Sequence, residues 1–277
     1  MIPAAFTYRR ASTVDEALAL LAEHGDDAKV LAGGHSLLPL MKLRFAAPEV
    51  LIDMAGVADL RYVRLDGDRV RIGALTRYHD LQHDGILLEH ARLVAHAAGE
   101  VGDPQVRHRG TIGGSVAHAD PAADVPAALL ASDATLVITG PQGTREVPIT
   151  EFFLGPFTTS LGADELLTEI VVPSHAGQGW GFEKFTRRAI DWAIVGVAAV
   201  GGSVALINMA GTPLRARAVE AALADGASIE DAAAHAAEGT SPVDEAHAGA
   251  DYRKHLAGVL TARALEQVAG RPPAGLT

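Results

Sequence analysis

The spacing of apolar and polar residues changes along the chain, and each change marks a predicted element. Over 14–21 the apolar residues recur at helical spacing, directly behind a capping box formed by Thr13 and Glu16, which predicts a helix of about three turns. Short apolar runs at 29–32 and 50–54 follow, with the helical pattern LLPLMKL between them. Strand, helix and strand in this order predict a small α/β unit.

Strand patterns dominate the middle of the chain. Two alternating runs joined around Asp66-Gly67 predict a β-hairpin. Apolar residues from Leu87 to Ala98 then mark one face of a helix, which Gly99 is expected to end. Three further strands are predicted from the apolar or alternating runs at 134–140, 145–149 and 165–173.

The character of the sequence changes after the Gly-Gln-Gly linker at 177–179. The next runs predict a three-stranded antiparallel sheet, in a separate C-terminal domain. The longest apolar stretch, 193–207, is too short for a membrane span and contains Gly201-Gly202, so we interpret it as two buried strands joined by a tight turn. Alanine-rich helical segments follow at 214–224, 228–237 and 252–269.

Composition removes several classes of function. The formal net charge of −11 and the pI near 5.5 argue against a general affinity for nucleic acid or for anionic membranes. The chain has no cysteine, which excludes disulfides, thiolate metal sites and iron–sulfur clusters held by this chain. Any redox chemistry therefore needs a bound cofactor. The start of the sequence lacks the apolar core of a signal peptide, so we expect a cytoplasmic protein.

Most familiar catalytic and nucleotide-binding motifs are absent from the sequence. No G-x-G-x-x-G opens a helix, and the stretch with P-loop spacing carries Gly202 where that loop needs lysine. His79 and His83 lie one helical turn apart, but the sequence offers no third zinc ligand near them, and exposed histidines are the commoner interpretation. Asp120 and Asp124 fit either an acid–base pair or simple helix caps, and these residues alone leave both open.

Two glycine segments of similar form remain, Ala32–Ser36 and Thr111–Ser115. Glycine lets backbone N–H groups turn toward one point and lets a ligand approach closely, and such a nest binds phosphate oxygens. Either segment alone is more often an ordinary turn. If the two face each other across a cleft, they suit the diphosphate of a dinucleotide better than a single phosphate.

Three motifs in this order and spacing carry a family resemblance: AGGHSLLPLMKLR, RHRGTIGGS and EKFTRRAIDWA. Together they make the chain similar to the FAD-binding medium subunit of the molybdenum hydroxylases, in the carbon monoxide dehydrogenase medium-chain type of the xanthine dehydrogenase family. The resemblance implies an α+β fold of PCMH type. Its two FAD-binding subdomains would span 1–56 and 57–176, and a C-terminal domain with a three-stranded antiparallel sheet and helices would span 177–277.

The resemblance also implies which residues bind FAD and assigns none to catalysis or to a metal. Asp124 matches a position that contacts FAD, Leu166 and Lys184 match flavin-side positions, and Trp192 lies where relatives place an aromatic residue near the isoalloxazine ring. His35 and Ser115 stand where many relatives have glutamine and asparagine, and both keep hydrogen-bonding capacity. The residues expected to wrap the diphosphate are Lys29, Val30, Leu31, Ala32, Gly33, Gly34, His35 and Ser36, with Thr111, Ile112, Gly113, Gly114 and Ser115.

The implied activity is that of an oxidoreductase subunit. In this family a large subunit holds the molybdenum cofactor, a small subunit holds [2Fe-2S] clusters, and the medium subunit transfers electrons through FAD to NAD, a quinone, oxygen or another acceptor. The resemblance implies a dimer of heterotrimers, in the cytoplasm or peripheral at the membrane through the complex, with no nucleic acid bound and no membrane span. Carbon monoxide, an aldehyde, a purine and an N-heterocycle all remain open as the reducing substrate.

Two other functions stay open. The first is a self-sufficient small flavin oxidase or reductase, which would need a substrate pocket of its own. The second is a non-redox scaffold or ligand-binding module in which both glycine segments are only turns, and that protein would be colourless.

Overall fold

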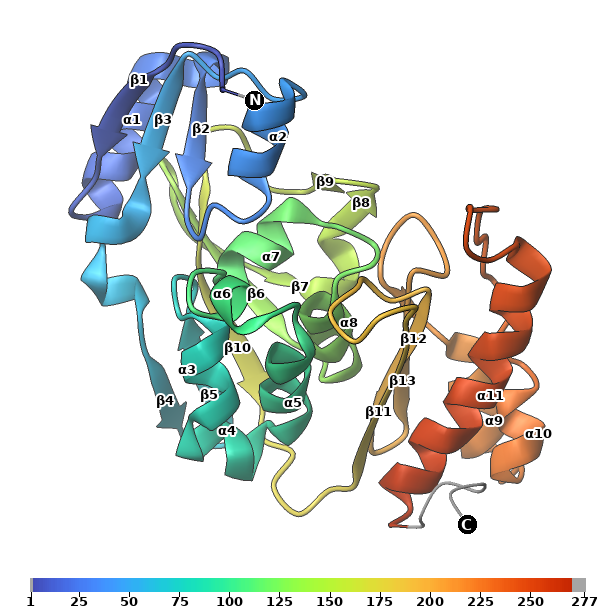
Figure 1. Ribbon diagram of the computed structural model, residues 1–277. Coiled ribbons are helices and arrows are strands. Elements are labelled where there is room, and N and C mark those ends of the chain that lie inside the picture. The colour runs from blue at the N-terminus through green and yellow to red at the C-terminus, as the bar shows by residue number, and fades with distance from the viewer. Residues whose placement is uncertain (1, 271–277) are drawn as a thin grey trace.

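Four β-sheets and the helices packed on them build the structure, a computed structural model that describes residues 2–270 (Figure 1). The helices are α1 (Val14–His24), α2 (Leu37–Leu43), α3 (Tyr78–His83), α4 (Gly85–His90), α5 (Arg92–Glu100), α6 (Pro104–Arg107), α7 (Ile112–His118), α8 (Asp124–Ala131), α9 (Arg217–Ala224), α10 (Ile229–Ala233) and α11 (Ala250–Val268). The strands are β1 (Thr7–Arg10), β2 (Ala28–Leu31), β3 (Val50–Asp53), β4 (Val63–Asp66), β5 (Arg69–Gly73), β6 (Thr135–Gly140), β7 (Gly143–Pro148), β8 (Phe153–Gly155), β9 (Thr158–Thr159), β10 (Leu166–Pro173), β11 (Trp180–Phe185), β12 (Val195–Val200), β13 (Ser203–Ile207) and β14 (Leu214–Arg215). The last part of the expected C-terminal domain, 271–277, lies outside the described residues.

The N-terminal unit is a three-stranded parallel sheet in the order β1-β3-β2. Thr13 caps α1 as predicted, because its Oγ1 accepts the Glu16 N–H at 3.1 Å. The Glu16 carboxylate reaches back one residue further than in the standard capping box and accepts the Ser12 N–H at 2.8 Å. Ala17 and Leu21 of this helix are buried in the apolar cluster that it shares with the sheet. The glycine segment follows β2 directly, so the parallel sheet fixes where that segment begins.

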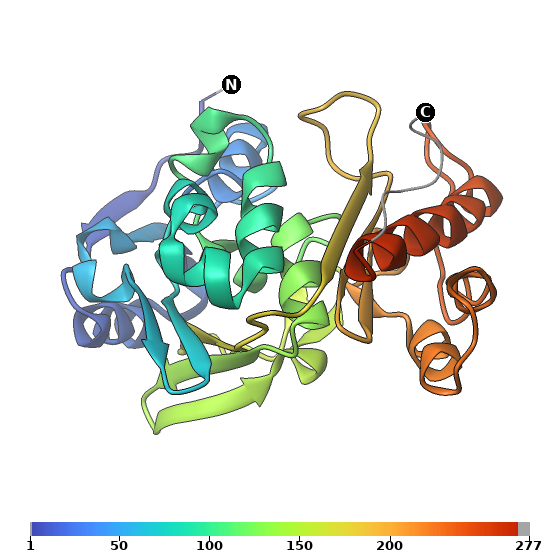
Figure 2. The ribbon, with the colours of Figure 1, turned by 90° about the horizontal axis from the view of Figure 1, so that it is seen from below.

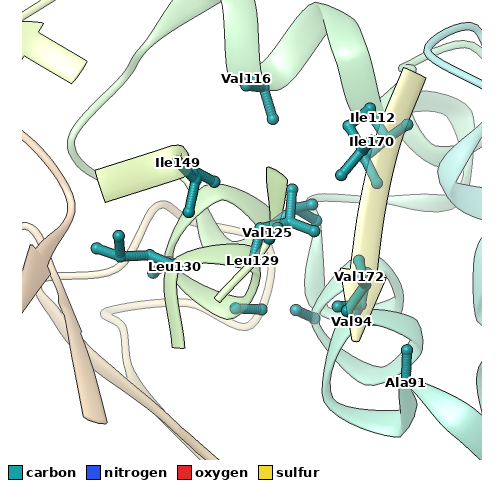
Figure 3. Close-up of a cluster of buried hydrophobic side chains, with 14 of the residues drawn as sticks. Ala91, Val94, Ile112, Val116, Val125, Leu129, Leu130, Ile149, Ile170 and Val172 are labelled. Atoms are coloured by element: carbon teal, nitrogen blue, oxygen red, sulfur yellow. The ribbon is translucent and has the colours of Figure 1, made fainter. Parts of the chain in front are cut away.

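The second unit is an antiparallel sheet in the order β4-β5-β10-β6-β7, packed with helices α3 to α8. The central strand β10 is buried from Leu166 to Val172. Its apolar residues fill the core, and its two buried polar residues, Thr168 and Glu169, are hydrogen-bonded to neighbouring side chains. Figure 3 shows 14 of the apolar side chains in this core. The single helix expected from Leu87 to Ala98 is wrong: Ala91 leaves the helical conformation and separates α4 from α5, and Gly99 lies inside α5.

The C-terminal sheet has four strands in the order β11-β12-β13-β14, so the expectation of three was incomplete. Leu214 and Arg215 pair with β13, and α9 therefore starts at Arg217 and not at residue 214. One face of this sheet packs on α8 and α5, and α11 lies along the other (Figure 2). Within residues 2–270 no helix combines the length and apolar character needed to cross a membrane.

Candidate functional site

The first glycine segment packs on the backbone directly ahead of the second, although about eighty residues separate the two in the sequence. A Cβ built on Gly33 would lie 2.5 Å from the carbonyl oxygen of Arg109 and 2.7 Å from the Cα of Gly110. A Cβ built on Gly114 would lie 3.6 Å from the Cβ of Ala32. The approach is possible only because position 33 has no side chain. The sequence allowed for two segments that face each other across a cleft. In the structure the backbones pack directly on each other at this point.

The first segment presents a run of unpaired backbone donors. Among the described residues, the N–H groups of Gly33 through Ser36 have no acceptor, while the carbonyls of Gly34 and Ser36 accept the N–H groups of Leu38 and Leu40 in α2 at 3.1 and 3.2 Å. Gly34 has φ +78°, a left-handed conformation that turns the chain between β2 and α2. Where successive free N–H groups of a turn converge, they form a concave anion site.

The second segment is the start of a helix and not a loop, which corrects the expectation of a second nest. Thr111 caps α7, because its Oγ1 accepts the N–H of Gly114 at 3.2 Å. The N–H groups of Ile112 and Gly113 donate to carbonyls in the β5–α3 connection, at 3.0 and 2.8 Å. These donors are occupied within the protein, and the Ser115 hydroxyl hydrogen-bonds Tyr78, so this segment offers fewer free donors than the first.

We expect Thr111→Ala to lower the free energy of unfolding by about 1 kcal/mol, since the N-cap oxygen of α7 is lost at a buried position. Chemical denaturation of the two chains measures the difference. Thr111→Ser keeps the capping oxygen and should recover most of the loss. Equal stability of the alanine and wild-type chains would show that the cap contributes nothing.

A buried ion pair lies beside these segments. The Lys184 ammonium on β11 is 2.7 Å from Asp124 Oδ2 at the start of α8, and the two side chains are only 6% and 4% exposed. The ammonium also donates to the Glu100 carbonyl at 3.0 Å. The second oxygen, Asp124 Oδ1, is buried and has no hydrogen-bond partner among the described residues. A buried carboxylate oxygen without a hydrogen bond lowers the stability of the fold, so this atom is suited to accept a hydrogen bond from a bound ligand.

The surroundings of Asp124 disfavour its charged form. Burial raises the pKa of Asp124 from its ordinary 3.8 to about 6, against the opposing effect of Lys184. The neighbouring Tyr78 phenol also has a raised pKa, chiefly because it is buried; a hydrogen bond with the Ser115 hydroxyl opposes the shift, and the Asp124 charge adds to it. Since the ring of Tyr78 also packs within 2.6 Å of a Cβ built on Gly110, it connects the glycine segments to the ion pair.

This pKa predicts a pH dependence of stability. Between pH 3.8 and about 6 the unfolded chain releases the Asp124 proton while the folded chain keeps it, so the group's contribution becomes less favourable as pH rises. Relative to Asp124→Asn, the wild-type chain should lose up to about 3 kcal/mol of unfolding free energy across that interval. Denaturation curves at steps of pH test this. A difference between the two chains that does not change with pH would contradict it.

The remaining predicted positions lie in different surroundings. Leu166, at the start of β10, is buried in the apolar cluster of the N-terminal unit beside Leu75. Trp192 is 58% exposed and lines a cleft of about 600 Å³ between the second unit and the C-terminal sheet. His79 and His83 have ring centroids 4.9 Å apart, and no group of three or more potential metal ligands occurs in residues 2–270.

The residues present suit a ligand that carries both an anionic group and a hydrogen-bond donor. Unpaired N–H groups at Gly33 to Ser36 meet the first requirement, and Asp124 Oδ1 meets the second. A Cβ at Gly33 would fill the contact that shapes this site. These three observations fit FAD, which carries a diphosphate and a flavin ring with an N–H donor. Sequence reasoning missed Tyr78 and Gly110, because their role depends on contacts and not on a motif.

Comparison with known proteins identifies the class of this chain as an FAD-binding flavoprotein of molybdopterin-dependent dehydrogenases. A family described as "FAD binding domain in molybdopterin dehydrogenase" matches residues 4–175, and "CO dehydrogenase flavoprotein C-terminal domain" matches residues 180–268. The chain belongs to this family, as its three motifs indicated. FAD is its cofactor, and the molybdenum and iron–sulfur centres belong to other subunits.

The chain is similar over nearly its whole length to medium chains of such enzymes. It is 44% identical to the carbon monoxide dehydrogenase medium chain of Hydrogenophaga pseudoflava, over 96% of this chain and 97% of that one. It is 37% identical to the glyceraldehyde dehydrogenase medium chain of Sulfolobus acidocaldarius, over 97% and 100%. A solved structure of the H. pseudoflava carbon monoxide dehydrogenase aligns with a TM-score of 0.95 at 46% identity, covering 98% of this chain and 100% of that one. The α+β fold and the role as the FAD-carrying medium subunit of a molybdenum hydroxylase are thereby confirmed.

Proposed function

We propose that this chain takes electrons from [2Fe-2S] clusters on a small partner subunit and delivers them to an acceptor outside the complex. FAD supplies the redox chemistry, since a flavin can accept electrons singly and pass them on singly or in pairs. The chain's own residues bind and orient this group. The clusters have to lie on a partner because the chain has no cysteine to ligate them.

Two observations carry this proposal: the N–H groups of Gly33 to Ser36 have no acceptor within residues 2–270, and Asp124 Oδ1 is buried without a hydrogen-bond partner there. We propose that these N–H groups and the Ser36 and Ser115 hydroxyls hold the diphosphate, within the binding segments Lys29–Ser36 and Thr111–Ser115. Asp124 Oδ1 accepts a hydrogen bond from the cofactor, and Lys184 holds that carboxylate in place from the other oxygen. Leu166 and Trp192 contribute flavin-side contacts.

We further propose that another chain selects the reducing substrate. Support comes from two medium chains, named for carbon monoxide and for glyceraldehyde, that are 44% and 37% identical to this chain over at least 96% of its length. The assembly we expect contains a large molybdenum subunit and a small iron–sulfur subunit, as a dimer of heterotrimers in the cytoplasm, with or without attachment to a membrane surface. Light scattering of the purified complex measures its mass and decides the stoichiometry.

The test of the proposed function begins with the purified full-length chain and excess FAD. One FAD should bind per chain, and the loaded chain alone should not oxidise small substrates. Electron transfer should appear only when the two partner subunits are added. Turnover by the chain alone would favour the self-sufficient oxidase or reductase, and a chain that binds no flavin, with or without its partners, would overturn the proposal.

A further inference from the structure

The segment that carries Trp192 is an excursion between two paired strands. Residues 186–193 leave the sheet after β11 and return before β12, and the Ile194 N–H donates to the Phe185 carbonyl at 2.8 Å at its base. Within the excursion, the Arg188 guanidinium binds the Asp191 carboxylate at 2.9 to 3.2 Å. The Trp192 indole itself has no hydrogen bond or ring contact among the described residues, so its position depends on how its backbone is held.

Asn208, the only asparagine in the chain, connects this excursion to the FAD site. It follows β13 in the left-handed conformation, with φ +60°. Its side-chain Nδ2 donates to the Ala193 carbonyl at 2.8 Å, directly after Trp192. Its backbone N–H donates to the Pro121 carbonyl at 2.9 Å, in the turn that leads into α8 and Asp124. One residue therefore links the backbone beside Trp192 to the backbone ahead of Asp124.

Arg253 on α11 supports this link from behind. Its side chain is 1% exposed, and its guanidinium donates to the carbonyls of Asn208 at 2.8 Å, Ile194 at 3.0 Å and Val243 at 2.9 Å. The nearest carboxylate oxygen, from Glu245, is 3.4 Å away. Backbone carbonyls thus take up most of the donors of a buried cation, and the guanidinium fixes both the end of the excursion and the residue that anchors it.

We infer that Asn208, backed by Arg253, is a positioning residue that holds Trp192 at a fixed place relative to Asp124. The part of this inference that concerns the flavin rests on the proposed function. If Trp192 covers the isoalloxazine ring, Asn208 sets how the ring is shielded from water and hence tunes its redox potential. The Asn208 side-chain amide holds the end of the excursion within the C-terminal domain, and its backbone N–H ties that domain to the turn ahead of Asp124.

The test uses the full-length chain with Trp180→Phe, which leaves Trp192 as the only tryptophan. Asn208→Gly accepts the left-handed backbone and keeps the N–H to Pro121 and the carbonyl for Arg253, but lacks Nδ2. Without FAD, time-resolved fluorescence anisotropy should show about a twofold larger amplitude of nanosecond motion at Trp192. In Asn208→Asp the new side chain has the size of asparagine but no N–H donor, so this variant should show the same increase in motion as Asn208→Gly. The test can therefore be made even if the glycine variant does not fold.

Asp133→Gly is the matched control, because Asp133 is also left-handed, with φ +50°, and its side chain binds Arg215 and not the excursion. It should leave the anisotropy unchanged. In FAD-loaded chains, the Asn208 variants should keep FAD affinity within about threefold and shift the flavin midpoint potential. Unchanged anisotropy in both Asn208 variants would overturn the inference even if FAD binds. Absence of FAD binding in the wild type would instead overturn the proposed function and leave the anisotropy result standing.

Discussion

Gly33→Ala is expected to weaken FAD binding by at least about 100-fold, which corresponds to about 2.7 kcal/mol. The added Cβ would lie 2.5 Å from the Arg109 carbonyl oxygen and 2.7 Å from the Gly110 Cα. Both neighbours are backbone atoms and cannot rotate away, so the first glycine segment has to move away from Arg109 and Gly110. That movement displaces the unpaired N–H groups that we propose bind the diphosphate. Equilibrium titration with FAD, followed by flavin fluorescence, measures the change.

Gly85→Ala is the control for this substitution. Gly85 is the first residue of α4, and a Cβ built there meets no atom within 4 Å. Alanine suits a helix better than glycine, so this variant should bind FAD as the wild type does and be at least as stable. If Gly33→Ala binds FAD within about threefold of the wild type, the contact between the segments does not shape the cofactor site.

Lys184→Met should lower the free energy of unfolding by about 3–5 kcal/mol, the range for removing one partner of a buried ion pair. The variant leaves the Asp124 carboxylate 4% exposed, with one oxygen unpaired already and the other deprived of its cation at 2.7 Å. The Glu100 carbonyl also loses its donor. Guanidinium denaturation measures the loss, and it should be smaller well below pH 3.8, where Asp124 is protonated in both states.

The double variant Lys184→Met with Asp124→Leu separates stability from binding. Replacing both charges by apolar side chains removes the buried unpaired carboxylate, so most of the lost stability should return. FAD affinity should stay low, because the acceptor at Asp124 is gone. An unfolding free energy of the single variant within about 0.5 kcal/mol of the wild type would show that the pair contributes little. Wild-type FAD affinity in the double variant would exclude Asp124 from the site.

Much of the fold could be predicted because local patterns and tertiary packing agree there. The capping box before α1 and the turn at Gly201-Gly202 between β12 and β13 need only neighbouring residues, and both are present. Strand β1 was missed because all four of its side chains are exposed, so it shows no apolar alternation. Strand β14 has only two residues, Leu214–Arg215, and forms by pairing with β13. It was missed because the alanine-rich sequence that follows predicts a helix, and the predicted helix was extended back over these two residues.

The site was predicted in part, for a different reason. The glycine pairs indicated that the backbone is closely approached at these positions, but they did not indicate by which group. The structure shows that Gly33 packs on Arg109 and Gly110, and that the Gly113 N–H donates to a carbonyl in the β5–α3 connection. The pairing of Asp124 with Lys184 joins residues 60 positions apart on different units, and no spacing rule predicts it. The family resemblance singled out both residues, and only the structure shows that they meet.

The central claim is that electrons leave the complex through this chain. Its most direct test is an anaerobic reductive titration of the assembled three-subunit complex with its reducing substrate, with the iron–sulfur and flavin absorbance followed together. We predict that both bands bleach, and that the flavin band recovers when an acceptor is added. Reduction of the iron–sulfur clusters with a flavin band that stays oxidised, or a fully active complex from which no FAD is released on denaturation, would contradict the account.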